Sequence, residues 1–187
     1  MARAFAVWLT GLPASGKSTI ARALTKLLAR RGIDVAVLES DVLRAILTPH
    51  ATYSDEDRRT FYRAFSYIGT LLTDHGVPVV FDATASLRAY RRYARATIPD
   101  FVEVYIDCPP RVCEARDPKH LYQRAHASEI ATLPGPQSDY QPPLEPDLVV
   151  SGDRDRPDQA ARRIVALLEA RGYIAAATSS EAEVVWH

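Results

Sequence analysis

The residues best suited to chemistry lie near the start of the chain, in the stretch GLPASGKS at positions 11–18. It follows an apolar run at 4–10 and precedes a helical pattern at 19–32. In that setting the pattern G-x-x-x-x-G-K-[S/T] forms a loop whose backbone N–H groups converge on phosphates at a helix N-terminus. Lys17 can then reach the β- and γ-phosphates and Ser18 can offer its hydroxyl to Mg²⁺. A nucleoside triphosphate site is favoured over a plain glycine-rich turn.

A second group of candidates follows the next apolar run. Asp41 and Arg44 stand in LESDVLR, at the end of a strand expected over 34–40. Strand ends are where open α/β sheets bind ligands. A carboxylate there can face a substrate hydroxyl or hold Mg²⁺, and the arginine can clamp an anion. The alternative is a helix-capping aspartate with a solvated arginine one turn later.

Asp82 is a third candidate, because it ends the apolar stretch VPVVFD. Such an aspartate is typical of the second acidic motif of phosphate-loop proteins, which holds Mg²⁺. The alternative is that Asp82 caps the helix expected to begin near Ser86. The sequence leaves both interpretations open.

Alternating strands and helices must position these residues. The sequence predicts strands at 4–10, 34–40, 77–84, 101–107 and 147–152, and helices at 19–32, 54–76, 86–96 and 156–172. Ser54 is expected to cap the second helix. Residues 108–146 are expected to form helical pieces followed by an irregular loop. This order predicts a three-layer α/β fold with a parallel sheet covered on both faces.

Length and composition limit the function further. The 187 residues fit one domain, expected over 1–174 with a tail at 175–187. The 23 basic and 23 acidic side chains cancel, which argues against nucleic-acid binding. Neither a membrane span nor a cleaved signal is expected, so we expect a cytoplasmic protein. Cys108 and Cys113 are interpreted as ordinary thiols.

Four stretches together resemble the adenylylsulfate kinase family: GLPASGKST, LESDVLR, YSDEDRR and CEARDPKHLYQRAHASEI…DYQPPLEPDLVV. The resemblance covers roughly residues 5–170. It implies a phosphate-loop kinase with a five-stranded parallel sheet, which transfers the γ-phosphate of ATP to the 3′-hydroxyl of adenosine 5′-phosphosulfate. It also implies a mobile lid over about 109–140 and a possible homodimer. Mg²⁺ is the cofactor expected from the phosphate loop.

The resemblance also implies roles for individual residues. The nucleotide site would comprise Gly11, Leu12, Pro13, Ala14, Ser15, Gly16, Lys17, Ser18, Thr19 and Arg116. Substrate binding would involve Asp41, Arg44, Tyr53, Arg58, Phe61 and Lys119. Lys17 and Asp41 would be catalytic. Ser18, Asp41 and Asp82 are the expected metal ligands, which follows from the loop and the strand ends described above rather than from the resemblance. For the lid residues Arg116 and Lys119 the alternative is mere solvation, and for Arg58 it is a helix-surface salt bridge.

The sequence departs from the family pattern on the acceptor side. Phe61 replaces an asparagine, Ala85 replaces a serine, and Thr132 and Leu133 replace a lysine and a phenylalanine. These changes predict an altered acceptor pocket. Two alternatives follow: a related kinase for another nucleotide-linked or phosphorylated small molecule, or a nucleotide-binding module without turnover.

Overall fold

The computed structural model describes residues 4–50, 54–129, 133–135 and 138–176. Five parallel strands form one sheet in the order β2-β3-β1-β4-β5. The strands are β1 (Ala6–Thr10), β2 (Ala36–Glu39), β3 (Val79–Asp82), β4 (Phe101–Asp107) and β5 (Leu148–Ser151). The predicted parallel sheet is confirmed.

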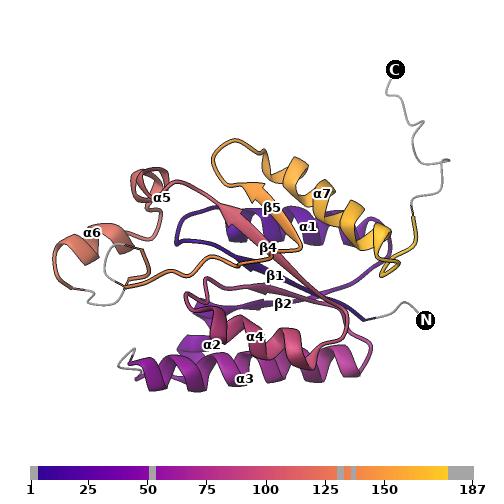
Figure 1. The fold of residues 1–187 in the computed structure, drawn as a ribbon, viewed down its shortest axis with the longest axis horizontal. Helices are drawn as coiled ribbons and strands as arrows, with labels where there is room; N and C mark the ends of the chain where they lie inside the picture. Colours follow the sequence, from indigo (N-terminus) through magenta and orange to yellow (C-terminus); the bar gives the residue numbers. More distant parts are fainter. Residues whose placement is uncertain (1–3, 51–53, 130–132, 136–137, 177–187) are drawn as a thin grey trace.

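Helices cover both faces of the sheet, as the predicted three-layer fold requires (Figure 1). One face carries α1 (Lys17–Ala29) and α7 (Pro157–Ala170), and the other carries α3 (Asp55–Asp74) and α4 (Arg88–Thr97). Three shorter helices, α2 (Ser40–Leu47), α5 (Pro110–Arg116) and α6 (Leu121–His126), lie toward the end of the sheet where the strands terminate.

The central strand β1 divides the interior into two cores. Val7 and Leu9 join the core under α1 and α7, whereas Ala6 and Trp8 join the core under α3 and α4. This alternation follows from the two-residue period of a strand. Trp8 is fully buried, stacks on Phe81 at a centroid distance of 4.6 Å and donates from its indole N–H to the Ala83 carbonyl.

Most predicted elements are confirmed, with one correction. The strand expected to run to residue 40 ends at Glu39, and α2 begins at once. Asp41 therefore lies in the first turn of a helix rather than at a strand end. Ser54 caps α3 as predicted, since its hydroxyl accepts a hydrogen bond from the Asp57 N–H at 3.2 Å.

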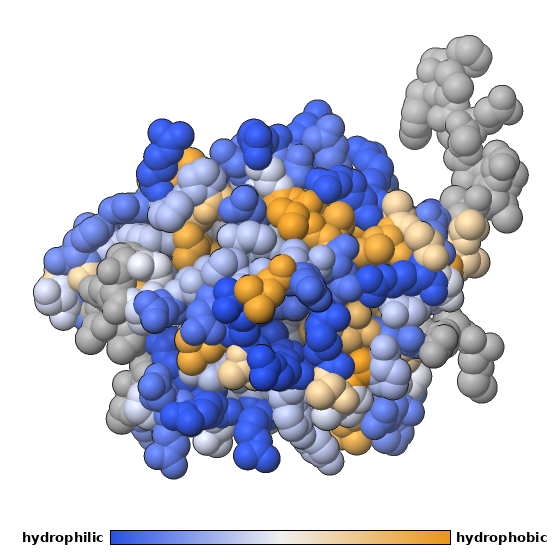
Figure 2. Space-filling view, in the orientation of Figure 1, coloured by the Kyte–Doolittle hydropathy of each residue, from blue (hydrophilic) through white to orange (hydrophobic). Residues whose placement is uncertain are grey.

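The surface of the molecule is mostly hydrophilic. Hydrophilic side chains cover most of the face shown in Figure 2, between small hydrophobic patches. In the part of the chain that the structure describes, no helix is long and apolar enough to cross a membrane. The expected tail falls largely on residues 177–187, outside the described residues.

Candidate active site

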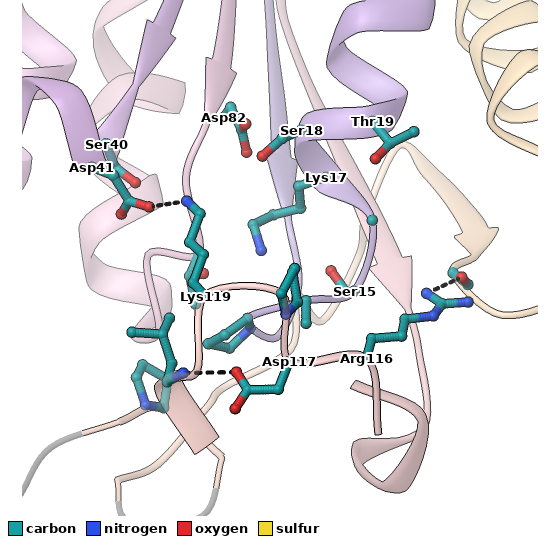
Figure 3. A pocket seen from close by; sticks show the side chains of 18 of the residues that line it. Ser15, Lys17, Ser18, Thr19, Ser40, Asp41, Asp82, Arg116, Asp117 and Lys119 are labelled. Atoms are coloured by element: carbon teal, nitrogen blue, oxygen red, sulfur yellow. Dashed lines mark hydrogen bonds and ion pairs between the residues drawn. The ribbon is translucent and has the colours of Figure 1, made fainter. Parts of the chain in front are cut away.

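A cavity of about 1090 Å³ opens at the carboxyl ends of the strands. It is lined by the phosphate loop, the start of α2, the end of β3, the segment of α5 and α6 that is expected to form the lid, and the turn after β5. Figure 3 shows Lys17, Asp41, Asp82 and Lys119 directed toward this common space. The topology therefore brings together polar residues that lie far apart in the sequence.

The phosphate loop supplies the floor of the cavity. Gly16 caps α1 with φ of 106°, a left-handed conformation that suits glycine. Lys17 is 8% exposed and donates from Nζ to the carbonyls of Gly11 and Leu12, at 3.1 and 2.8 Å. Burial lowers the pKa of the Lys17 amine, against the opposing effect of the Asp82 and Asp41 carboxylates. The amine is thus held over the loop where an anion can reach it.

Asp41 is paired with a lid residue. The Nζ of Lys119 lies 2.5 Å from Oδ2 of Asp41, and the side chains are 60% and 69% exposed. This hydrogen bond raises the pKa of Lys119, which therefore stays charged at neutral pH. The pair joins α2 to the segment between α5 and α6 across the cavity (Figure 3).

Asp82 is 6% exposed at the end of β3 and lines the cavity beside Ser18 (Figure 3). The alternative capping role is not supported, because α4 is capped by Leu87 without a side-chain hydrogen bond. Within the described residues the Asp82 carboxylate has no hydrogen bond or ion pair, although its charge acts on both Lys17 and Lys119. A buried carboxylate in that position is suited to a cation.

Arginines and a tyrosine form the wall beside Asp41. Arg44, Arg58 and Tyr62 line the cavity, and the Arg44 guanidinium lies 3.9 Å from the centroid of the Phe61 ring. Phe61 itself is 1% exposed and is not among the lining residues. Arg44 is therefore packed against an aromatic ring, and the alternative of a solvated arginine is not supported.

The opposite wall joins the lid to the turn after β5. Arg116 donates from its guanidinium to the Gly152 carbonyl at 2.8 Å. Gly152 leaves no room for a side chain, because a Cβ there would lie 2.4 Å from the Ser15 carbonyl oxygen. The turn is thus pressed against the phosphate loop, with Arg116 across its outer side. Arg116 and Lys119 each contact another segment of the chain, Arg116 the Gly152 carbonyl and Lys119 the Asp41 carboxylate, so they are not merely solvated.

The lid is attached to the phosphate loop by an apolar cluster. Tyr122 is 2% exposed and donates from its hydroxyl to the Pro13 carbonyl at 3.0 Å. Leu133 is buried beside Leu12 in the same cluster, which also contains the free thiols Cys108 and Cys113. Burial raises the pKa of Cys113 to about 12, so its thiol is unreactive at neutral pH, as expected for an ordinary thiol.

A buried arginine that the sequence analysis missed fixes the loop after β3. Arg91 is 2% exposed, pairs with Glu103 at 2.5 Å and donates to the carbonyls of Ala85 and Gln141. Ala85 has φ of 42° and donates its N–H to the Tyr62 hydroxyl at 3.1 Å. Arg91 therefore ties this loop to the segment that follows the lid. An arginine in a helical pattern gives no signal of such burial.

Comparison with known proteins decides the family. Residues 3–151 match the adenylylsulphate kinase family. This chain belongs to that family. The adenylyl-sulfate kinase of Gloeothece citriformis is 40% identical over 172 residues, which cover 92% of this chain and 98% of that protein. The corresponding enzyme of Rippkaea orientalis is 40% identical over 90% of this chain and 93% of its own length.

Solved structures agree with this assignment. The Mycobacterium tuberculosis APS kinase CysC, in complex with AMPPNP and APS, matches with a TM-score of 0.85 and 40% identity, covering 90% of this chain and 99% of its own. The predicted adenylylsulfate kinase resemblance and phosphate-loop kinase fold are confirmed. A shikimate kinase from Aquifex aeolicus, at 17% identity and a TM-score of 0.52, is similar in fold alone.

The structure brings most of the predicted site residues to one cavity. The lining includes Pro13, Ala14, Ser15, Gly16, Lys17, Ser18, Thr19, Asp41, Arg44, Arg58, Asp82, Arg116 and Lys119. Gly11 and Leu12 lie beneath it as acceptors for Lys17. Tyr53 and Thr132 lie outside the described residues. The individual roles of these side chains stay predictions.

Proposed function

We propose that this chain is an ATP-dependent adenylylsulfate kinase, which transfers the γ-phosphoryl group to the 3′-hydroxyl of adenosine 5′-phosphosulfate. The observation that carries the proposal is the placement of Asp41 and Lys17 in one cavity of a chain that belongs to this family. The relatives named adenylyl-sulfate kinase align over nearly their full length, and the M. tuberculosis enzyme holds AMPPNP and APS together.

The phosphate loop is assigned to ATP. Its backbone amides and the start of α1 favour the negative charge of the phosphates, and Lys17 adds a cation. The hydroxyl of Ser15 is buried and has no hydrogen-bond partner among the described residues, which suits a loop that gains partners on ligand binding. Arg116 and the turn at Gly152 mark the side of the cavity assigned to the nucleobase.

Mg²⁺ is the proposed metal. Among the described residues, no group of three or more His, Cys, Asp or Glu side chains could hold a metal alone. Mg²⁺ in kinases is usually held by one or two protein oxygens together with substrate phosphates. The Ser18 hydroxyl and the Asp82 and Asp41 carboxylates offer such oxygens, so the residues fit. Bound there, Mg²⁺ would neutralise phosphate charge.

Phosphoryl transfer depends mainly on positioning and on charge. Asp41 accepts a hydrogen bond from the attacking hydroxyl and orients it toward the γ-phosphate. Lys17 stabilises charge on the transferred group, and Arg44 and Arg58 bind the anionic part of the acceptor. Lys119 brings the lid over the reacting groups and helps to exclude water.

Identification of the product tests this proposal. The purified protein is incubated with Mg-ATP and adenosine 5′-phosphosulfate, and the product is analysed by mass spectrometry and ³¹P NMR. We expect a new phosphate monoester on the 3′-oxygen. A matched sample with AMP in place of the acceptor tests whether the sulfate is required. ADP binding without product on either acceptor would support a nucleotide-binding module, and transfer only to other nucleotide-linked alcohols would support a related kinase.

A further inference from the structure

The short helix α2 carries two of the proposed site residues but is weakly embedded. None of its residues is buried, and Val42 and Ile46 are 54% and 68% exposed. Leu43 is partly buried against the core that contains Phe61. Such a helix has little apolar burial to fix its orientation, so its polar contacts with α3 gain importance.

One of these contacts is a stack between Arg44 and Phe61. The guanidinium carbon lies 3.9 Å from the Phe61 ring centroid and 5.6 Å from that of Tyr62. A cation within about 6 Å of an aromatic face is attracted to it, more strongly where water is excluded. The guanidinium carbon lies over the face of the Phe61 ring, and the N–H donors of a guanidinium point outward in its own plane. Arg44 can therefore stack on Phe61 and still donate to an anion in the cavity.

Phe61 has the properties of a fixed platform. It is 1% exposed and packs against Phe65 and Tyr62, at centroid distances of 5.5 and 5.2 Å. Tyr62 is held in turn, because its hydroxyl accepts a hydrogen bond from the Ala85 N–H. The ring therefore cannot shift without disturbing the core beneath it.

We infer that Phe61 is a positioning residue: it holds Arg44 and, through α2, Asp41 at the acceptor side of the cavity. This role rests on the proposed function, since it concerns the same acceptor. The phosphoryl acceptor bound on this side of the cavity would be a small molecule with two features: an oxyanion that binds the N–H donors of Arg44 and a hydroxyl that binds Asp41. Phe61 contributes without lining the cavity, which separates it from the direct substrate contact expected from the sequence.

Four variants test the inference: Phe61→Leu, Phe61→Tyr, Arg44→Ala and the double variant Phe61→Leu/Arg44→Ala. Phe5→Leu is the matched control, because Phe5 is an equally buried phenylalanine that stacks on Tyr173 in the other core, away from Phe61. KM for adenosine 5′-phosphosulfate, kcat and the Kd of a nucleotide analogue are measured for each. Hydrogen–deuterium exchange of residues 40–47 reports the anchoring of α2 without any turnover.

We expect Phe61→Leu to raise the acceptor KM about tenfold and to leave the nucleotide Kd within about twofold. Phe61→Tyr keeps the ring and should restore most of the loss. In the Arg44→Ala background, Phe61→Leu should add less than about twofold, because the partner of the ring is already absent. Exchange of residues 40–47 should increase in Phe61→Leu and in Arg44→Ala and stay unchanged in Phe5→Leu.

The inference would be overturned if the fold-changes of the two single substitutions multiplied in the double variant, or if Phe5→Leu changed the acceptor KM as much as Phe61→Leu. Lack of any acceptor-dependent turnover in the unmodified protein would reject the proposed function instead. The exchange measurement then still decides the role of the ring. If the exchange of α2 is unchanged in both Phe61→Leu and Arg44→Ala, the positioning role of Phe61 is rejected. If Phe61→Leu does not fold, Arg44→Ala alone still decides whether the contact anchors α2.

Discussion

Lys119 and Asp41 are 78 positions apart in the sequence, yet Nζ of the first lies 2.5 Å from Oδ2 of the second. The contact joins the lid to the helix that carries the proposed catalytic carboxylate. Both side chains are more than half exposed, so the pair adds little to stability. Its value lies in the position it gives to two charged groups at the mouth of the cavity.

Replacement of Lys119 by alanine should therefore impair catalysis much more than folding. We expect the free energy of unfolding to change by less than about 1 kcal/mol, because exposed ion pairs contribute no more than that. The acceptor KM should rise and kcat should fall. Thermal unfolding and steady-state kinetics on the same preparation check both parts; a large loss of stability with normal kinetics would contradict this role.

Asp41→Asn tests the role of the carboxylate in the chemical step. Single-turnover phosphoryl transfer should slow by about 10² to 10⁴, the usual contribution of a positioned base. The nucleotide Kd should be nearly unchanged, because the phosphate loop is intact. Near-normal transfer in this variant would remove Asp41 from the mechanism.

Asp82→Asn separates a metal role from a structural one. The Mg²⁺ concentration for half-maximal activity, and that for nucleotide binding, should rise about tenfold or more. The Tm of the ligand-free protein should change little, because the Asp82 carboxylate makes no ion pair with another described residue and the loss of its attraction to Lys17 opposes the gain from removing a buried charge. A lowered Tm with unchanged Mg²⁺ dependence would indicate a purely structural aspartate.

Arg91→Met tests the buried connection between β4, the loop after β3 and the segment after the lid. The substitution leaves the Glu103 carboxylate buried without its closest partner, and we expect a loss of about 3–5 kcal/mol in the free energy of unfolding. Urea unfolding measures it. Arg92→Met is the control: Arg92 is exposed on the same helix, and its replacement should cost less than about 0.5 kcal/mol.

The carboxyl of Asp147 should make the free energy of unfolding depend on pH. Burial tends to raise the pKa of its carboxyl, but hydrogen bonds from the Glu103 N–H, Arg95 and Arg171 hold the pKa below its usual value. Since the folded pKa is lower than the unfolded one, the carboxylate stabilises the fold above about pH 4, and this contribution is lost as pH falls through the folded pKa.

Asp147→Asn should therefore lower stability at pH 7 by about 1–3 kcal/mol and flatten the dependence on pH below 5. Unfolding in urea between pH 7 and 2 measures both effects. The exposed Asp34→Asn variant should behave like the unmodified protein. An unchanged slope in Asp147→Asn would show that other carboxyls dominate acid unfolding.

The sequence predicted those parts of the fold whose signals are local. The phosphate loop, the strands and the Ser54 cap each depend on residues that are close together in the chain. The helix α2 was missed because it has only eight residues and none of them is fully buried, with Leu43 alone reaching the core in part. Asp41 was placed correctly at the end of the sheet, although on a helix.

Contacts between distant segments were beyond the sequence. The pairing of Lys119 with Asp41, the stack of Arg44 on Phe61 and the burial of Arg91 each need the tertiary fold to bring two elements together. Asp41, Arg44 and Lys119 were expected at the site, but not these contacts. Arg91 gave no signal at all, because charged residues in helical patterns usually lie in solvent. Phe61 was expected to touch the substrate, and its burial beneath Arg44 was visible only in the structure.

The most direct test of the account is the rate of ADP formation from Mg-ATP with and without adenosine 5′-phosphosulfate. We predict ADP formation that depends on the acceptor, at rates typical of kinases, about 1–100 s⁻¹. That result would show that the cavity accepts this substrate with Phe61, Ala85 and Leu133 in place. An identical slow rate with and without the acceptor would contradict the proposed function.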